Sequence, residues 1–190
     1  VIGTMMEPVV LPGMKSEEEV AALKASKQGW ACVGHKLDYA HRAWIQPGHW
    51  LTSDMQKANE DAAALYESWK KDVQVEEYRL EDAEVVLTAY GISARICKSA
   101  VELLRAQGVK AGLIRPITVH PFPYAAYDHI DYSKVKAVLD AEMSIPAQFV
   151  DDVAVAVKDR CLIETCLCSG GNIMSRDKVL AAVKKIMEGK

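Results

Sequence analysis

Three cysteines near the C-terminal end are the first residues whose types could carry chemistry. Cys161, Cys166 and Cys168 lie within the segment CLIETCLC. A structural zinc site needs four ligands, and this segment offers three. The segment has the composition of a β-strand, in which side chains alternate between two faces, so only Cys166 and Cys168 share a face. Because free cysteine is among the most buried residue types, we favour core thiols over a metal or iron–sulfur site.

The histidines are the next candidates. His35 and His41 are six positions apart, with Asp38 between them. That spacing fits neither a pair on one helix face nor a tight metal-binding hairpin, so we expect polar groups at the surface or at an interface. Nucleophilic triads form in space and are not predicted by residue order. We therefore predict no catalytic residue and no metal ligand in this chain.

A short turn, Tyr90-Gly91-Ile92-Ser93, lies between an expected strand and an expected helix. Anions bind at such helix N-termini in open α/β sheets. The alternative is a tight turn with Ser93 as the helix N-cap. The chain has neither a Gly-x-Gly-x-x-Gly motif nor the lysine of a P-loop at this point. We favour the turn and predict no cofactor-binding residue.

The composition of the chain limits the classes of function that it could have. The chain has 190 residues, a formal net charge of −3 and 50% hydrophobic residues. This charge gives no reason to expect nucleic acid or an anionic membrane as a partner, and no apolar run has the length of a membrane span. Five cysteines without a secretion signal favour reduced thiols in the cytoplasm. The apolar start without Met leads us to expect a piece of a longer chain.

The second part of the sequence alternates between strand and helix patterns. Strands are expected at residues 83–90, 109–115, 136–142 and 161–167, and helices at 93–107, 148–158 and 175–187. The last two helices have apolar faces, which comprise Val150, Val153, Ala154 and Val157 in one and Val179, Val183 and Met187 in the other. Apolar strands separated by amphipathic helices predict a mostly parallel sheet covered on both faces.

The first part of the sequence does not show this alternation of strands and helices. Ser16 and Glu19 form a capping box that opens a helix through Lys24. Residues 27–50 are rich in tryptophan and glycine and are expected to be irregular. Ser53 and Gln56 supply a second capping pair. The helix that follows carries one apolar face, formed by Met55, Ala58, Ala62, Leu65 and Trp69.

Two loops follow expected strands and are candidates for binding. One runs from Arg115 and Pro116 through two further prolines, and the other runs from Glu142 to Gln148. Carboxyl ends of parallel strands are where such sheets gather their binding surfaces. We therefore propose Arg115, Pro116, Glu142 and Gln148 as residues of a subunit interface. An ion pair between Arg115 and Glu142 is an equal alternative.

Four segments, in matching order, carry a resemblance to a known family. They are GTMMEPVVLP (residues 3–12), EDAEVVLTAYGISAR (81–95), GLIRPITVHPFP (112–123) and AEMSIPAQFVDDVAVAV (141–157). Together they resemble the α subunit of 2-oxoacid:ferredoxin oxidoreductases, with the branched-chain, 2-oxoisovalerate type as the nearest form. Two positions depart from the family pattern. His120 stands where the family has Trp, and Ala147 stands before Gln148 where the family has Gly.

The resemblance implies a domain organisation. Residues 1–12 would be the tail of a thiamine-pyrimidine-binding domain that is otherwise absent, and residues 13–80 would be a helical and irregular connector. Residues 81–190 would form a transketolase C-terminal-like domain, an α/β three-layer sandwich with a mostly parallel, mixed sheet. This last domain would serve assembly and carry none of the chemistry.

The resemblance also implies an activity for the whole complex. Family members oxidatively decarboxylate a 2-oxoacid to an acyl-coenzyme A and pass electrons through iron–sulfur clusters to ferredoxin. The complex would use thiamine diphosphate, Mg and 4Fe-4S clusters, none of them bound by this chain alone. Its partners would be a thiamine-binding β subunit and a ferredoxin-like iron–sulfur subunit. The alternatives are a transketolase or 2-oxoacid dehydrogenase β-type C-terminal domain, and a stand-alone scaffold or binding module.

Overall fold

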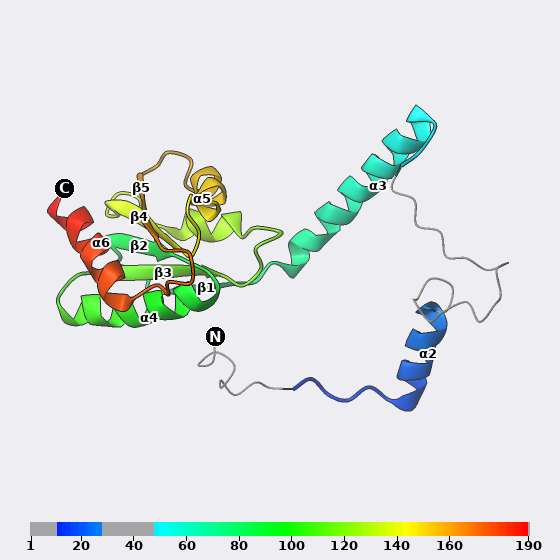
Figure 1. Cartoon of the computed structure of the whole chain (residues 1–190), viewed down its shortest axis with the longest axis horizontal. Helices are drawn as coiled ribbons and strands as arrows, with labels where there is room; N and C mark the ends of the chain where they lie inside the picture. The colour runs from blue at the N-terminus through cyan, green and yellow to red at the C-terminus, as the bar shows by residue number, and fades with distance from the viewer. Residues whose placement is uncertain (1–10, 28–47, 190) are drawn as a thin grey trace. The chain divides into compact units, whose positions relative to one another are not determined.

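A computed structural model describes residues 11–27 and 48–189 of the chain. The chain forms two compact units, residues 1–64 and residues 65–190 (Figure 1). The second unit contains the whole β-sheet. Within the described ranges, no helix is both long and apolar enough to cross a membrane.

Helix α2 (Glu17–Lys27) confirms the predicted capping box. The Ser16 backbone N–H donates to Glu19 Oε2 at 2.8 Å, and the Glu19 N–H donates to Ser16 Oγ at 3.2 Å. The helix ends at Lys27, three residues beyond the predicted end. None of its residues is buried, so capping and charge placement stabilise it rather than a core.

Helix α3 (Thr52–Trp69) begins earlier than the capping prediction requires. The Met55 N–H donates to the Leu51 carbonyl at 3.1 Å, which places Ser53 inside the first turn. The prediction that Ser53 is the N-cap is therefore wrong, and the Gln56 amide donates instead to Glu60 at 2.8 Å. Along the predicted apolar face, Ala58, Ala62 and Trp69 are partly buried and Met55 and Leu65 are exposed.

The sheet has five strands in the order β1-β3-β2-β4-β5. The strands are β1 (Val75–Tyr78), β2 (Val85–Thr88), β3 (Ala111–Pro116), β4 (Ala137–Glu142) and β5 (Leu162–Leu167). The four predicted strands are β2 to β5, and they pair in parallel. Strand β1 is antiparallel to β3 and was not predicted. Its sequence, VEEY, has two carboxylates, which an edge strand tolerates because its outer positions meet solvent.

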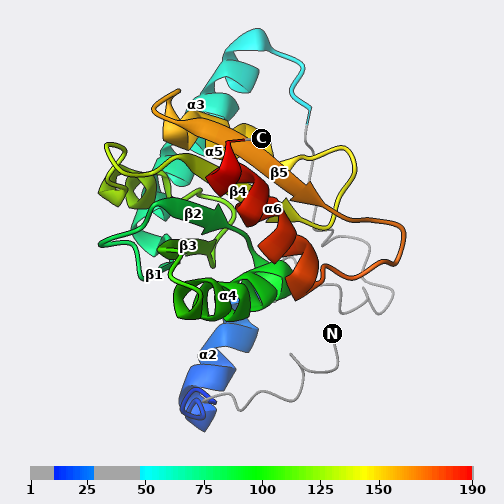
Figure 2. The ribbon, with the colours of Figure 1, turned by 90° about the vertical axis from the view of Figure 1, so that its left-hand side faces the viewer.

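Helices cover both faces of the sheet (Figures 1 and 2). Helices α4 (Gly91–Ala106) and α6 (Arg176–Glu188) pack on one face. Helix α5 (Phe149–Val157) and the 3₁₀ helix η2 (Tyr124–His129) pack on the other. A short 3₁₀ helix, η1 (Lys70–Asp72), precedes β1. The predicted α/β three-layer sandwich with a mixed, mostly parallel sheet is confirmed.

The alternation along the strands divides the core in two. Leu87, Leu113 and Leu139 face α4 and α6, whereas Val86, Ile114 and Val138 face α5 and η2. Each such side chain contributes roughly 1.5–3 kcal/mol on burial. Because these strands are buried on both faces, their sequences are continuous apolar runs.

Two helix predictions need correction and one is confirmed. Helix α4 begins at Gly91, whose φ of 56° suits glycine, and Ser93 is buried within the helix rather than at its N-cap. In α5, Val153 and Val157 are buried as predicted, whereas Ala154 is exposed and Val150 is only partly buried. The buried face of α5 is completed by Phe149 and Ala156.

Helix α6 follows its predicted pattern. The Ser175 hydroxyl accepts from the Lys178 N–H at 3.2 Å and caps the helix. Val179 and Val183 are buried and Met187 is partly buried. The last helix therefore packs through the face that its sequence predicts.

Candidate functional site

The four predicted interface residues lie at the carboxyl edge of the sheet, at two places. Arg115 and Pro116 end β3, whereas Glu142 ends β4 and Gln148 is the N-cap of α5. Strand β2 lies between β3 and β4. By the alternation of side chains, Arg115 shares the α4 face with Leu113, and Glu142 shares the α5 face with Val138. The alternative in which Arg115 pairs with Glu142 is therefore wrong.

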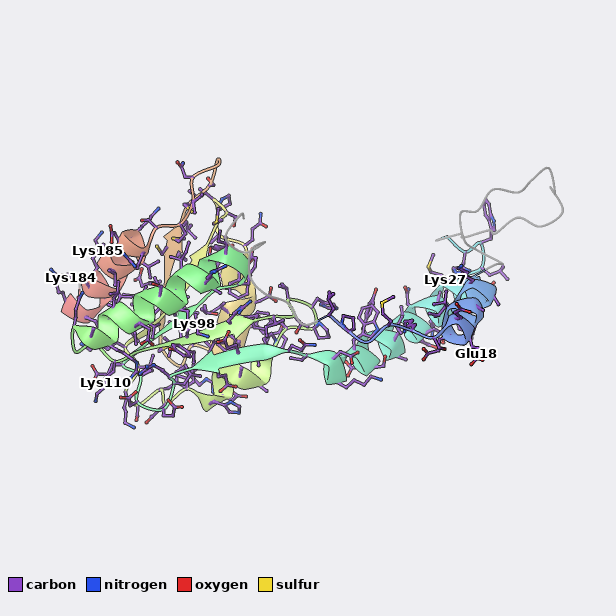
Figure 3. All side chains as sticks on the ribbon, turned by 90° about the horizontal axis from the view of Figure 1, so that it is seen from below. Glu18, Lys27, Lys98, Lys110, Lys184 and Lys185 are labelled. Carbon is purple, nitrogen blue, oxygen red and sulfur yellow. The ribbon has the colours of Figure 1, made fainter. Side chains whose placement is uncertain are left out.

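Arg115 belongs instead to an ion-pair network with Glu76 and Lys98. Arg115 Nη1 lies 3.1 Å from Glu76 Oε2. Lys98, which lies on α4 (Figure 3), binds the other oxygen through its Nζ. Lys98 lowers the pKa of Glu76 most, burial opposes this effect, and Arg115 lowers it further. The network ties edge strand β1 to β3 and α4.

Glu142 is a buried carboxylate that caps α5. Its side chain is 1% exposed. Oε1 accepts from the Gln148 N–H at 2.7 Å and from the Phe149 N–H at 3.2 Å, and Oε2 accepts from Ser144 Oγ at 2.8 Å. A negative charge at a helix N-terminus also interacts favourably with the helix dipole. Glu142 and Gln148 therefore belong to one local structure, in which Glu142 orders the loop of residues 143–148.

The loops at this edge expose large apolar side chains. The exposed residues follow β2, β3, β4 and β5, and we call them the carboxyl-edge surface: Tyr90, Ile117, Val119, Met143, Ile145 and Ile173. Ile145 and Ile173 are 62% and 65% exposed. Exposed apolar side chains of this kind are candidates for a surface that contacts another molecule. The loops after β3 and β4 also contain cis peptide bonds at His120–Pro121 and Ile145–Pro146.

His120, one of the two departures from the family pattern, contacts the end of α3. Its ring lies 6.1 Å from that of Tyr66 and 6.2 Å from that of Trp69, in edge-on geometry, and the Tyr66 and Trp69 rings are 5.0 Å apart. Aromatic pairs in this arrangement attract one another. The loop after β3 is thus fixed to the last turn of α3.

Asp140, which sequence reasoning missed, is a buried carboxyl in the middle of β4. It is 0% exposed, and neither of its oxygens accepts a hydrogen bond from a described residue. Burial is the main cause that raises its pKa to about 8, and the charge of Glu142 and a hydrogen bond from the protonated Asp140 carboxyl to Glu142 add to it. The available signal was an acidic residue within the apolar run AVLDAE. A strand buried on both faces shows no alternation, so the sequence did not reveal which way Asp140 points.

A hydroxyl pair lies beside Asp140. Thr88 is the direct neighbour of Asp140 in the β2–β4 pairing. The Thr88 hydroxyl is 2.5 Å from the Tyr127 hydroxyl, and burial raises the pKa of Tyr127. The part of the sheet under α5 therefore combines the Glu142 carboxylate with its three donors, the Asp140 carboxyl that accepts no hydrogen bond from a described residue, and two hydroxyls that bond to each other.

Of the four described cysteines, Cys97, Cys166 and Cys168 are buried in the core and Cys161 is partly buried. Cys166 and Cys168 are buried on the α6 face, as predicted, and Cys166 lies 3.6 Å from the Met174 sulfur. Burial raises the pKa of Cys97 to about 12 and raises the pKa of Cys166, which keeps both as thiols. His35 and His41 lie outside the described residues.

A comparison with protein families matches residues 83–179 to pyruvate:ferredoxin oxidoreductase core domain II. The chain belongs to this family. The predicted resemblance to 2-oxoacid:ferredoxin oxidoreductase subunits is confirmed, and the matched residues begin at the strand–helix repeat and include both loops proposed as an interface.

Relatives match over nearly all of this chain. The ketoisovalerate oxidoreductase subunit VorB of Methanothermobacter marburgensis is 32% identical over 98% of the chain and 50% of its own length. The pyruvate synthase subunit PorA of Methanothermobacter thermautotrophicus is 25% identical over 96% of the chain and 49% of its own length. The chain thus spans about half the length of these curated relatives.

A solved structure shows the same fold. The 2-oxoglutarate:ferredoxin oxidoreductase from Magnetococcus marinus, with 2-oxoglutarate, coenzyme A and succinyl-CoA bound, has a TM-score of 0.61 at 19% identity. The two structures match over 73% of this chain and 24% of the Magnetococcus marinus chain. The family match, rather than this likeness, separates the chain from a transketolase-type domain.

Proposed function

We propose that the chain is the C-terminal half of an α-type subunit of a 2-oxoacid:ferredoxin oxidoreductase. The complex would oxidatively decarboxylate a branched-chain 2-oxoacid to an acyl-coenzyme A and reduce ferredoxin. The observation that carries this proposal is the alignment of 98% of the chain with the ketoisovalerate oxidoreductase subunit, at a higher identity than with the pyruvate synthase subunit.

Within that complex, we propose that residues 81–190 form an assembly domain. Residues 13–80 would connect it to a thiamine-pyrimidine-binding domain, of which residues 1–12 are the tail. Three observations support the role. Exposed apolar residues lie at the carboxyl edge, Glu142 orders the loop of residues 143–148, and burial raises the pKa values of Cys97 and Cys166, which keeps both as thiols.

The four interface residues then divide by role. Pro116 is buried at the end of β3 and holds the start of the loop that exposes Ile117. Arg115 is fixed to Glu76, and Glu142 positions Gln148. Gln148 is exposed, so its side chain is available for a direct contact with a partner.

The cofactors would be held elsewhere in the complex. In residues 11–27 and 48–189, no three His, Cys, Asp or Glu side chains converge on one point, so this part does not fit a 4Fe-4S cluster or the Mg ion of thiamine diphosphate. A thiamine-binding β subunit and a ferredoxin-like iron–sulfur subunit would supply those sites. We expect a cytoplasmic complex that takes up coenzyme A and reduces ferredoxin, and an isolated chain without activity.

The test is made on the protein expressed from its complete gene in its own host, tagged and purified without oxygen. Viologen reduction is followed with 2-oxoisovalerate, pyruvate and 2-oxoglutarate, each with and without coenzyme A. We expect reduction that requires coenzyme A and is fastest with 2-oxoisovalerate. Fastest reduction with another 2-oxoacid would overturn the substrate, and a purified assembly without any such activity would overturn the reaction.

A further inference from the structure

Asp140 and Glu142 are acidic residues two positions apart on the same face of β4, and they have opposite surroundings. Glu142 accepts hydrogen bonds from the Ser144 hydroxyl and from the backbone N–H groups of Gln148 and Phe149. Asp140 is equally buried and accepts no hydrogen bond from a described residue, and its carboxyl has only Glu142 to donate to when it carries a proton. An unpaired charge in such a place is costly, and the group avoids the cost by binding a proton.

The elements around Asp140 offer no positive charge to offset an ionised carboxyl. Helix α5 carries only Asp151 and Asp152 as ionisable groups, and both are acidic. On η2, Tyr127 is bonded to Thr88, and His129 is exposed and bound to Glu77 at 2.9 Å.

The remaining groups of η2 and the groups on the other neighbouring elements are also neutral, acidic or occupied. On η2, Tyr124 bonds to Asp152 at 3.4 Å and Asp128 pairs with Arg160 at 2.8 Å. Tyr90, before α4, has a pKa raised by burial, Glu142 and Asp140.

On the far face of the sheet, Cys97 and Cys166 are thiols whose pKa values are raised mainly by burial and less by Asp140. Lys178 of α6 lowers the pKa of Cys166 on that face, and its ammonium group donates to the Leu167 carbonyl. On β5, the direct neighbour of Asp140 is Thr165, which carries no charge.

Water reaches Asp140 only if the cover of this face moves. Phe149, the first residue of α5, is 4% exposed and packs on Tyr90 and Phe122, with ring centroids 5.1 Å and 5.7 Å apart. Its N–H is one of the groups that Glu142 holds. Release of the Glu142 cap would therefore loosen both the loop of residues 143–148 and the start of α5 above Asp140.

We propose that Asp140 is a proton-controlled switch for this loop. The loop stays docked on Glu142 while Asp140 carries a proton, and it loosens as Asp140 loses that proton. The exposed Met143 and Ile145 lie on the loop, so the switch acts on the carboxyl-edge surface whether or not that surface binds a partner.

The direction of the pH dependence follows from linkage. The docked state raises the pKa of Asp140 to about 8, and the loosened state returns it toward an ordinary value of about 4. Loosening therefore releases a proton at intermediate pH. Its equilibrium constant rises up to about tenfold per pH unit between about pH 4 and pH 8, and is level outside this window.

The first experiment measures hydrogen exchange of the Gln148 and Phe149 amides between pH 5 and 9 in the protein expressed from its complete gene, corrected for intrinsic exchange. Protection should fall by up to about tenfold per pH unit until about pH 8. Asp140→Asn keeps the shape of the neutral acid and should remove this slope. Glu164→Gln, at an exposed acid on β5, should keep it. Equal slopes in native protein and Asp140→Asn would overturn the switch.

A second measurement needs no variant. The ¹³C chemical shift of the Asp140 carboxyl is followed through the same titration by NMR. A midpoint near pH 8 supports the switch, and a midpoint near pH 4 overturns it even if Asp140→Asn does not fold. Neither readout depends on viologen reduction, so failure of the proposed enzyme activity is separate from failure of the switch.

Discussion

The Glu142 carboxylate accepts a hydrogen bond from the Gln148 N–H at 2.7 Å, across a loop that returns the chain from the end of β4 to the start of α5. This contact joins two residues predicted to face a partner, and it shows that one of them positions the other. Glu142 is buried and shapes the loop, whereas the loop itself is exposed. Substitutions at the two kinds of position should therefore have different consequences.

Loss of the Glu142 cap should destabilise the fold. Glu142→Ala leaves the Gln148 and Phe149 N–H groups without their acceptor and should lower the free energy of unfolding by about 2–4 kcal/mol in denaturant titrations. Glu142→Gln keeps one acceptor oxygen and should lose less. Glu164→Ala, at an exposed position of β5, is the control and should change stability by less than about 0.5 kcal/mol. Equal effects of Glu142→Ala and Glu164→Ala would contradict the capping role.

The exposed loop should matter for assembly rather than for stability. Ile145→Asp replaces an apolar side chain that is 62% exposed on the carboxyl-edge surface. If that surface binds a partner subunit, the substitution should weaken co-purification of the complex at least tenfold while thermal unfolding stays unchanged. Val155→Asp, at a 61% exposed position of α5 outside that surface, is the matched control. Weakening by both variants alike would remove the surface from the interface.

Gly112 should tolerate no side chain because of close backbone packing. A Cβ atom there would lie 2.8 Å from the Arg79 carbonyl oxygen and 2.9 Å from Leu80 Cδ2. Gly112→Ala should therefore cost about 1–3 kcal/mol of unfolding free energy, measured in urea. Nothing lies within 4 Å of a Cβ added at Gly48, so Gly48→Ala should be nearly neutral. If Gly112→Ala left the free energy of unfolding unchanged, β3 and the turn at Arg79 could move apart without loss of stability.

The buried hydroxyl pair should show coupling. Tyr127→Phe leaves the Thr88 hydroxyl without its partner, and Thr88→Val does the same to Tyr127, so each should cost about 1–3 kcal/mol. The double variant removes both polar groups and should cost less than the sum of the single variants. Additive costs in such a double-mutant cycle would show that the two hydroxyls are independent.

The ion-pair network around Glu76 should respond unequally to its two cations. Lys98 lowers the pKa of Glu76 more than Arg115 does, so Lys98→Ala should raise that pKa further than Arg115→Ala. Because the folded pKa lies below the ordinary value of 4.5, the stabilisation is present above that value and is lost as the pH falls through the folded pKa. The pair is partly exposed, so each loss should stay below about 1 kcal/mol. NMR titration of the Glu76 carboxyl gives the order directly.

The sequence by itself determined the four parallel strands and the helices between them. Apolar runs such as AVLDAE and amphipathic segments such as that of α6 depend on local patterns, and burial on both faces of a sheet requires those patterns. The capping box at Ser16 was also predictable, because a cap involves neighbours within three positions. The family resemblance came from the same segments.

Only the tertiary structure decided which side chains meet. The strand order places β2 between β3 and β4, and the alternation along each strand places Arg115 and Glu142 on opposite faces. The ion pair between them that the sequence allowed therefore does not form. The sequence of β1 contains too few apolar residues to predict a strand. The strand forms because its backbone pairs with the edge of β3. The surroundings of Asp140 could not be predicted either, because the residues next to an acid in a buried strand do not show which side chains it will face. Charge, burial and register are set by contacts between distant segments, and these follow from the fold as a whole.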